Sequence, residues 1–255
     1  MQHFEHNGVR LAYIDHPAIG GDKQEPILLI HGFASNHSVN WVSTLWVKVL
    51  TEAGRRVIAI DNRGHGHSQK LYEAAAYSTL NMADDALALM DHLGIGRFDL
   101  MGYSMGARIS AFVAAAAPSR VRALIIGGLG DYLIEGGGLS TRIAEAMEAP
   151  TLAEVTEPTQ RMFRKFAEFT KSDLRALAAC IRGSRQRMGL EIARQITSPT
   201  LVAVGTTDLV AGDGEKLAAE LPNAQFLPIP GRDHNLAVGD KVYKTGVLEF
   251  LARRA

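Results

Sequence analysis

The sequence predicts an α/β fold in which helices cover both faces of a mostly parallel sheet. Short, largely apolar runs recur along the 255-residue chain, and strands that are buried on both faces have this composition. Segments with an apolar stripe at helical spacing separate most of these runs. Repeated strand–helix units of this kind are typical of parallel sheets, so the chain is expected to form an α/β core.

A β-hairpin is predicted at the beginning of the chain. Residues 4–6 and 9–14 flank Asn7 and Gly8, which form the favoured two-residue turn because both turn positions need a positive φ. A polar connection follows, and the first buried strand is expected at residues 26–30.

The rest of the core is expected to alternate between strands and helices. Apolar runs predict further strands at residues 56–60, 98–101, 121–127, 200–204 and 225–228. Helices are expected over residues 41–53, 79–93, 107–117, 215–221 and 241–253. Ser78 is a suitable cap for the second helix, and Gly94 a suitable stop. The core-facing stripe of that helix is expected to contain Leu80, Met82, Ala83, Ala86, Leu87, Met90 and Leu93.

The chain changes character between residues 131 and 197. No strand-like run occurs there, and a glycine run at residues 136–138 is followed by amphipathic helical patterns. We therefore expect residues 1–130 and 198–255 to form the α/β core. Residues 131–197 are expected to form a helical cap inserted into it, and we call this segment the cap.

Composition and charge restrict the possible classes of function. Hydrophobic residues make up 47% and charged residues 21% of the chain, as in ordinary globular proteins. The 27 Lys and Arg residues equal the 27 Asp and Glu residues, so nothing favours a nucleic-acid or membrane partner. Cys180 is the single cysteine, which excludes an intrachain disulfide. No secretory signal or membrane-spanning run is visible, so a cytoplasmic location is expected.

A serine lies between a predicted strand and a predicted helix, in the motif Gly102-Tyr103-Ser104-Met105-Gly106. A serine with glycine two residues away on each side forms a nucleophile elbow in this context. Only glycine fits at the two flanking positions, because the strand and helix backbones nearly touch. The turn lifts the Ser104 hydroxyl to a helix N-terminus, where negative charge is favoured.

A serine hydroxyl needs a base to become nucleophilic, and the base needs an orienting acid. His234 is the favoured base, because its loop follows the last strand and can reach the elbow. Asp208, just past the preceding strand, is the favoured acid, while Asp131 remains an alternative that could instead cap the first cap helix. Asp233 is a poor candidate, because it is adjacent to the histidine whose ring it would have to bind.

Two backbone N–H groups are expected to stabilise the oxyanion that forms when the serine attacks a carbonyl. Met105 follows the nucleophile directly and supplies one of them. Phe33 is the expected second donor, because it follows the strand at residues 26–30 and Gly32 allows the backbone to turn. His31 is expected to brace this loop, and His65 and His67 lack a nearby third ligand for a metal.

Four motifs occur in order: His31-Gly32-Phe33, the loop at residues 61–68, Gly102-Tyr103-Ser104-Met105-Gly106, and Gly205-Thr206-Thr207-Asp208 with His234. With these motifs the chain resembles the α/β-hydrolase superfamily, in the capped group that includes carboxylesterases, lactonases, cofactor-free perhydrolases and carbon–carbon bond hydrolases. The resemblance implies an eight-stranded sheet whose first two strands are antiparallel at one edge. It also implies that Arg63 and Ser68 support the site. One position departs from the pattern, since Gly212 stands where the acid loop often has a proline.

The expected function is that of a serine hydrolase, which cleaves small to medium carboxylic esters through an acyl-enzyme without a metal or organic cofactor. The partner is therefore a small-molecule ester or lactone; oligomeric state is not predicted. Alternatives are an enol-lactonase, a carbon–carbon bond hydrolase of the meta-cleavage type, a cofactor-free perhydrolase and a non-catalytic binding protein. The cap should set substrate choice, and most of its large apolar residues are expected to pack within it: Tyr132, Met147, Met162, Phe163, Phe166, Phe169 and Met188.

Overall fold

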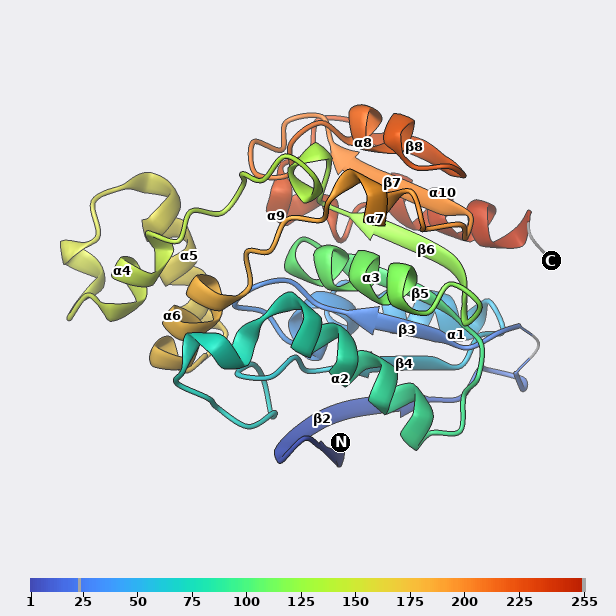
Figure 1. Cartoon of the computed structure of the whole chain (residues 1–255), viewed down its shortest axis with the longest axis horizontal. Helices are drawn as coiled ribbons and strands as arrows, with labels where there is room; N and C mark the ends of the chain where they lie inside the picture. The colour runs from blue at the N-terminus through green and yellow to red at the C-terminus, as the bar shows by residue number, and fades with distance from the viewer. Residues whose placement is uncertain (23, 254–255) are drawn as a thin grey trace.

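A twisted sheet of eight strands forms the centre of the molecule (Figure 1). The computed structural model describes residues 1–22 and 24–253. The strands are β1 (Gln2–His6), β2 (Val9–His16), β3 (Ile27–Ile30), β4 (Val57–Ile60), β5 (Phe98–Tyr103), β6 (Val121–Gly127), β7 (Thr200–Gly205) and β8 (Ala224–Ile229). Their order in the sheet is β1-β2-β4-β3-β5-β6-β7-β8. The β1–β2 and β2–β4 pairs are antiparallel and all other pairs are parallel, which confirms the expected topology.

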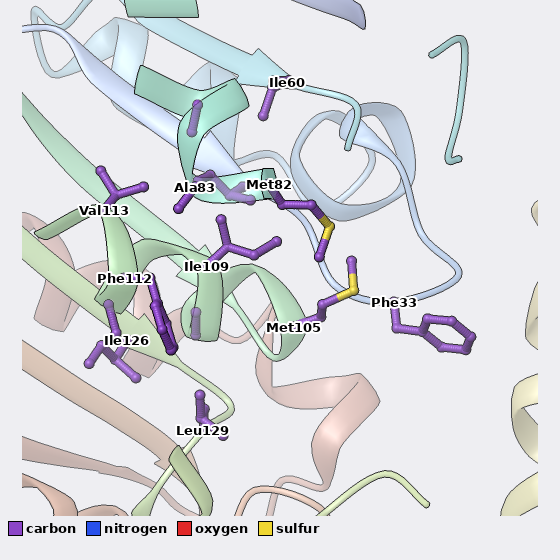
Figure 2. Close-up of a cluster of buried hydrophobic side chains, with 14 of the residues drawn as sticks. Phe33, Ile60, Met82, Ala83, Met105, Ile109, Phe112, Val113, Ile126 and Leu129 are labelled. Carbon is purple, nitrogen blue, oxygen red and sulfur yellow. The ribbon is translucent and has the colours of Figure 1, made fainter. Parts of the chain in front are cut away.

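Helices cover both faces of this sheet, as the sequence predicts. The helices of the core are α1 (Trp46–Glu52), α2 (Thr79–His92), α3 (Met105–Ala116), α8 (Gly214–Glu220), α9 (His234–Ala237) and α10 (Lys241–Ala252). The side chains of β3 alternate, so that Leu28 and Ile30 join one buried cluster while Ile27 and Leu29 join another. The first cluster includes α2 and α3, and Figure 2 shows Met82, Ile109 and Val113 within it. The second includes α1 and α10.

The predicted helix at residues 41–53 is wrong in its first half. A π-helical turn at Ser38–Val42 is separated from α1 by Leu45, whose φ is 68°. Trp41 and Trp46 are five residues apart, which would place them about 140° apart around a continuous α-helix. The break lets both indoles become fully buried, with their ring centroids 6.5 Å apart.

The helix predicted at residues 79–93 is confirmed as α2, but its stripe is partly wrong. The Ser78 hydroxyl accepts a hydrogen bond from the Asn81 N–H and caps the helix as expected. Leu80 is 61% exposed, whereas Leu89 is fully buried. The two positions differ because Met82 and Leu89 lie about 20° apart around the helix axis and so share the core-facing side. Leu80 lies about 160° from Met82, on the opposite side.

Residues 131–197 contain helices and turns but no strand in the part of the chain that the structure describes. The helices are α4 (Ile143–Glu148), α5 (Pro158–Phe169), α6 (Leu174–Gly183) and α7 (Leu190–Ala193). Helices α4, α5 and α6 lie beyond one end of the sheet (Figure 1). The short helix α7 instead packs against α3 of the core. None of the helices within residues 1–22 and 24–253 is long and apolar enough to cross a lipid bilayer.

Candidate active site

The turn between β5 and α3 holds Ser104 in a conformation that is rare for a residue with a side chain. The backbone of Ser104 has a φ of 55° and a ψ of −114°. A Cβ atom at Gly102 would collide with the carbonyl of Gly106, and one at Gly106 would collide with the carbonyl of Ile30 in β3. The close approach of strand and helix therefore explains both glycines of the motif.

Replacing Gly106 with alanine is expected to destabilise the protein, because the new methyl group cannot avoid the β3 backbone. Overpacking of this kind costs about 1–3 kcal/mol or more. The melting temperature should therefore fall by roughly 2 to 12 °C in a thermal scan followed by circular dichroism. Gly96 is the matched control, because a Cβ added there would meet nothing within 4 Å. If the Gly106→Ala and Gly96→Ala proteins have the same melting temperature, the expected clash with β3 is wrong.

A continuous chain of hydrogen bonds links Ser104, His234 and Asp208. The Ser104 Oγ lies 2.9 Å from His234 Nε2, and His234 Nδ1 lies 2.7 Å from Asp208 Oδ2. The other carboxylate oxygen of Asp208 accepts hydrogen bonds from the N–H groups of Val210 and Ala211, at 2.8 and 3.0 Å. These backbone donors fix the orientation of the carboxylate and leave Oδ2 facing the imidazole.

His234 begins the short helix α9, although the sequence predicts a loop at this position. Asp233 caps that helix by accepting hydrogen bonds from the N–H groups of Asn235 and Leu236. The Tyr103 hydroxyl donates to the carbonyl oxygen of His234 at 2.6 Å. Asp233 thus binds the backbone rather than the ring of His234. An aspartate is a favoured residue at a helix N-terminus, and this preference is the signal that could have predicted the start of α9.

Asp131, the alternative acid, lies in a different network. Its Oδ1 accepts a hydrogen bond from the Asp213 N–H at 2.8 Å, and its Oδ2 is 3.2 Å from Lys216 Nζ. It therefore binds the beginning of α8. Within the described residues, its carboxylate does not accept hydrogen bonds from the N-terminus of a helix in the cap, which was the other role suggested by the sequence. Gly212 has a φ of 79°, and a Cβ atom there would collide with the Asp131 carboxylate. Proline cannot adopt that φ, which explains the departure at this position.

Phe33 and Met105 lie at the wall of the small cavity beside Ser104. Within the described residues, neither backbone N–H has a protein acceptor. The loop of Phe33 is held by Asn40, whose Oδ1 accepts a hydrogen bond from the Gly32 N–H at 3.1 Å. The Nδ2 of Asn40 is buried without a hydrogen-bond partner in the described part of the chain. Asn40 also lines the larger of two hollows beside Ser104. Asn40 was missed, because an asparagine eight residues beyond Gly32 carries no local signal.

The cap contacts the same loop from the other side. The Thr170 hydroxyl, at the end of α5, donates to the carbonyl oxygen of Ala34 at 2.9 Å. Ala34 is fully buried and has a φ of 57°. The rings of Phe33 and Phe163 lie 6.0 Å apart between centroids. Helix α5 therefore fixes the position of the loop that carries Phe33.

His31 braces its loop as expected, and His65 is fully buried beside it. His31 is fully buried, its Nδ1 donates to the carbonyl oxygen of Gly32 at 2.8 Å and its Nε2 accepts from the Asn62 N–H at 3.0 Å. Burial lowers the pKa of His31 to about 4 and that of His65 to about 3, so both rings are neutral at pH 7. No group of three or more His, Cys, Asp or Glu residues suited to a metal occurs within the described residues.

The loop at residues 61–68 is held by buried polar contacts. The Arg63 guanidinium donates two hydrogen bonds of 2.7 Å to the carboxylate of Asp85 in α2. The Ser68 hydroxyl donates to the carbonyl oxygen of Asp61 and accepts from the Ala12 N–H. These bonds hold the loop in place, and the support of the site that the resemblance implies stays a prediction. They connect the loop to α2 and β2, and neither side chain lines a cavity beside Ser104.

Two hollows open beside Ser104. The larger has a volume of about 420 Å³, and His234, Phe163 and Phe166 are among its lining residues. The smaller has a volume of about 30 Å³, and Arg108 and Arg185 are among its lining residues. Of the apolar cap residues, three line the larger hollow: Met162, Phe163 and Phe166. The others behave differently, since Met147 and Met188 are buried in packing, Tyr132 is half-buried and Phe169 is 74% exposed.

Comparison with known proteins agrees with this architecture. Residues 25–129 match the model of the alpha/beta hydrolase fold family. A crystal structure of a hydrolase from Pseudomonas aeruginosa PA01 superposes with a TM-score of 0.73 at 25% identity, and covers 98% of this chain and 97% of that one. The chain belongs to the α/β-hydrolase superfamily. The fold and the family that the sequence predicts are thereby confirmed.

The proteins similar to this chain differ in the reactions that their names describe. The dihydrolipoyllysine-residue acetyltransferase component of the acetoin cleaving system of Pseudomonas putida is 33% identical over 85% of this chain. The chain spans only 60% of the length of that protein. The non-heme chloroperoxidase CPO-A1 of Kitasatospora aureofaciens is 27% identical, and the match covers 96% of this chain and 97% of that protein. The reaction of this α/β hydrolase must therefore be argued from its own site.

Proposed function

We propose that this protein is a serine hydrolase that cleaves small to medium carboxylic esters through an acyl-enzyme. Ser104 is the nucleophile, His234 the general base and Asp208 the acid that orients it. One observation carries the proposal: the hydrogen bonds from Asp208 through His234 to Ser104 end at a cleft of about 420 Å³. A cleft of this size accommodates a small or medium ester.

The hydrogen bonds assign the protons of the resting site. The Asp208 carboxylate only accepts, so the ring proton of His234 lies on Nδ1 and Nε2 is free to accept from the Ser104 hydroxyl. Ser104 Oγ attacks the ester carbonyl while its proton passes to Nε2, and Asp208 stabilises the imidazolium that forms. The imidazolium then returns this proton to the leaving alcohol, and the C–O bond to that alcohol breaks.

The second half-reaction uses the same groups. Water loses a proton to His234 Nε2 and attacks the acyl carbonyl, and the proton then returns to Ser104 Oγ as the acid leaves. In both tetrahedral intermediates, the oxyanion accepts hydrogen bonds from the Phe33 and Met105 N–H groups. Their lack of other acceptors in the described part of the chain supports this role. Each such donor is worth roughly 100- to 1000-fold in rate.

A serine-directed fluorophosphonate probe tests the proposal most directly. The probe should label wild-type protein at one site, Ser104, and should not label the Ser104→Ala variant. A panel of p-nitrophenyl esters of increasing chain length, together with simple lactones, then identifies the preferred acyl group. Protein that neither reacts with the probe nor hydrolyses any ester or lactone would refute the proposal and favour a ligand-binding role.

Thr170 is expected to act as a positioning residue for the Phe33 N–H. Thr170→Val removes the hydrogen bond to Ala34, whose net worth of about 1 kcal/mol corresponds to a roughly fivefold loss in rate if it fixes the oxyanion donor. The loss should fall on kcat rather than KM, as measured by steady-state kinetics. Thr170→Ser retains the hydroxyl and should restore kcat. If serine and valine behave alike, the hydrogen bond has no part in positioning.

A further inference from the structure

The small hollow beside Ser104 brings two arginine side chains next to the proposed nucleophile. The hollow has a volume of about 30 Å³ and is lined by Ser104, Met105, Arg108, Ser184 and Arg185, together with apolar residues and two glycines of the cap. A buried water needs roughly 10–15 Å³ by this measure, so the hollow holds about two waters, which is close to the size of a carboxylate group.

Arg108 carries a buried positive charge without a carboxylate partner. It lies on α3 one turn after Ser104, and only 6% of it is exposed. Its guanidinium donates to the carbonyl oxygens of Tyr132, Leu133 and Gln186, all of which are neutral. No ion pair of Arg108 is found within residues 1–22 and 24–253. Burial, with a contribution from Arg185, lowers the pKa of Arg108 to about 10, so the group stays charged at pH 7.

Arg185 brings a second cation to the same hollow from the cap. It follows α6 and donates a hydrogen bond to the carbonyl oxygen of Gly137, and burial lowers its pKa. The acidic side chains of Asp131 and Glu135 both bind Lys216 instead. Two like charges therefore share a partly desolvated space, and the described residues supply no carboxylate between them. Desolvated charges are costly unless they are paired, so this space favours an anion that comes from outside the protein.

We propose that the hollow binds a carboxylate carried by the substrate, so that the preferred substrates are monoanionic esters such as the half-esters of short dicarboxylic acids. This inference rests on the proposed ester hydrolysis at Ser104. The anion would lie within a few bonds of the scissile carbonyl, because Ser104 and both arginines line one small hollow. Arginine is suited to this role, since its planar guanidinium binds carboxylates through two parallel hydrogen bonds.

A pair of matched esters tests the inference. Monoethyl succinate and ethyl levulinate have the same carbon skeleton around the ester, but a methyl group replaces the charged oxygen in levulinate. We expect wild-type protein to hydrolyse monoethyl succinate with a kcat/KM that is about 10- to 100-fold higher, through a lower KM. The Arg185→Gln variant should lose most of this preference. Arg185 is the better position to replace, because Arg108 also braces three backbone carbonyls.

Arg187 provides the matched control. It is an exposed arginine two residues further on, its guanidinium donates to the carbonyl oxygen of Glu135, and it does not line the hollow. The Arg187→Gln variant should retain the wild-type preference. A wild-type protein that hydrolyses both esters equally well, or an Arg185→Gln variant that keeps the wild-type preference, would overturn the inference.

A binding measurement separates this inference from the proposed reaction. Calorimetric titration of the Ser104→Ala protein with monoethyl succinate needs no turnover. Binding that disappears when Arg185→Gln is added to that protein supports the anion site, even if wild-type protein hydrolyses no ester and the proposed function fails. Ester hydrolysis without any such binding keeps the proposed function and overturns the anion site.

Discussion

Replacing Ser104 with alanine is expected to lower kcat for ester hydrolysis by a factor on the order of 10⁴ to 10⁶. The hydroxyl is the proposed nucleophile, and without it water would have to attack the ester directly. Alanine keeps the Cβ atom of serine, so the backbone strain at φ 55° is unchanged and the fold should be retained. The measurement is steady-state hydrolysis of p-nitrophenyl acetate and butyrate, with melting curves to verify folding.

Ser110 gives a matched control for this loss. It is a fully buried serine of α3, and its hydroxyl has no hydrogen-bond partner in the described part of the chain. The Ser110→Ala variant should keep wild-type kcat, because its hydroxyl neither lines a hollow beside Ser104 nor binds His234. Activity of Ser104→Ala above about 1% of wild type, in protein free of contaminating esterase, would show that another group is the nucleophile.

The sheet was predictable because most of its strands can be recognised from the apolar residues of their own segments. The runs at β3 and β4 are apolar throughout, and the Asn7-Gly8 turn adopts the positive φ angles that define its hairpin. The helix before α1 was not predictable in the same way. The break at Leu45 accompanies the burial of Trp41 and Trp46, and the rings of Trp46 and Tyr243 of α10 lie 5.0 Å apart. That contact joins segments nearly two hundred residues apart, so it cannot be predicted from the sequence around either residue.

The candidate site also contains residues that could be predicted from local sequence and residues that could not. Ser104, His234 and Asp208 follow strands whose ends meet at one edge of the sheet, so topology alone brings them together. The groups that hold the site were missed, because their partners lie far away in the sequence. Thr170 reaches Ala34 across 136 positions, and Arg108 reaches the carbonyl of Gln186 across 78. A lone threonine or arginine carries no sign of such a partner.

Asp208→Asn is expected to lower kcat by about 10⁴ without unfolding the protein. The N–H groups of Val210 and Ala211 both donate to Oδ1 of Asp208, so the asparagine must keep its carbonyl oxygen at that position. Its NH₂ group then faces His234 Nδ1 and donates to it. The ring proton moves to Nε2, which can no longer accept the proton of Ser104. Steady-state kinetics measures the loss, and labelling by a fluorophosphonate should slow in parallel.

Asp131→Asn distinguishes this explanation from a general loss of negative charge near the sheet edge. Asp131 lies next to Lys216 and the Asp213 N–H, and an asparagine can still accept from that N–H. This variant should therefore keep kcat within about twofold and lose at most about 1 kcal/mol of stability, as partly exposed ion pairs usually contribute no more than that. If Asp131→Asn loses activity and Asp208→Asn retains it, the orienting acid has been misassigned. The short contact between Asp208 and His234 would then be a structural bond alone, because orientation of the imidazole is the step that distinguishes the two carboxylates.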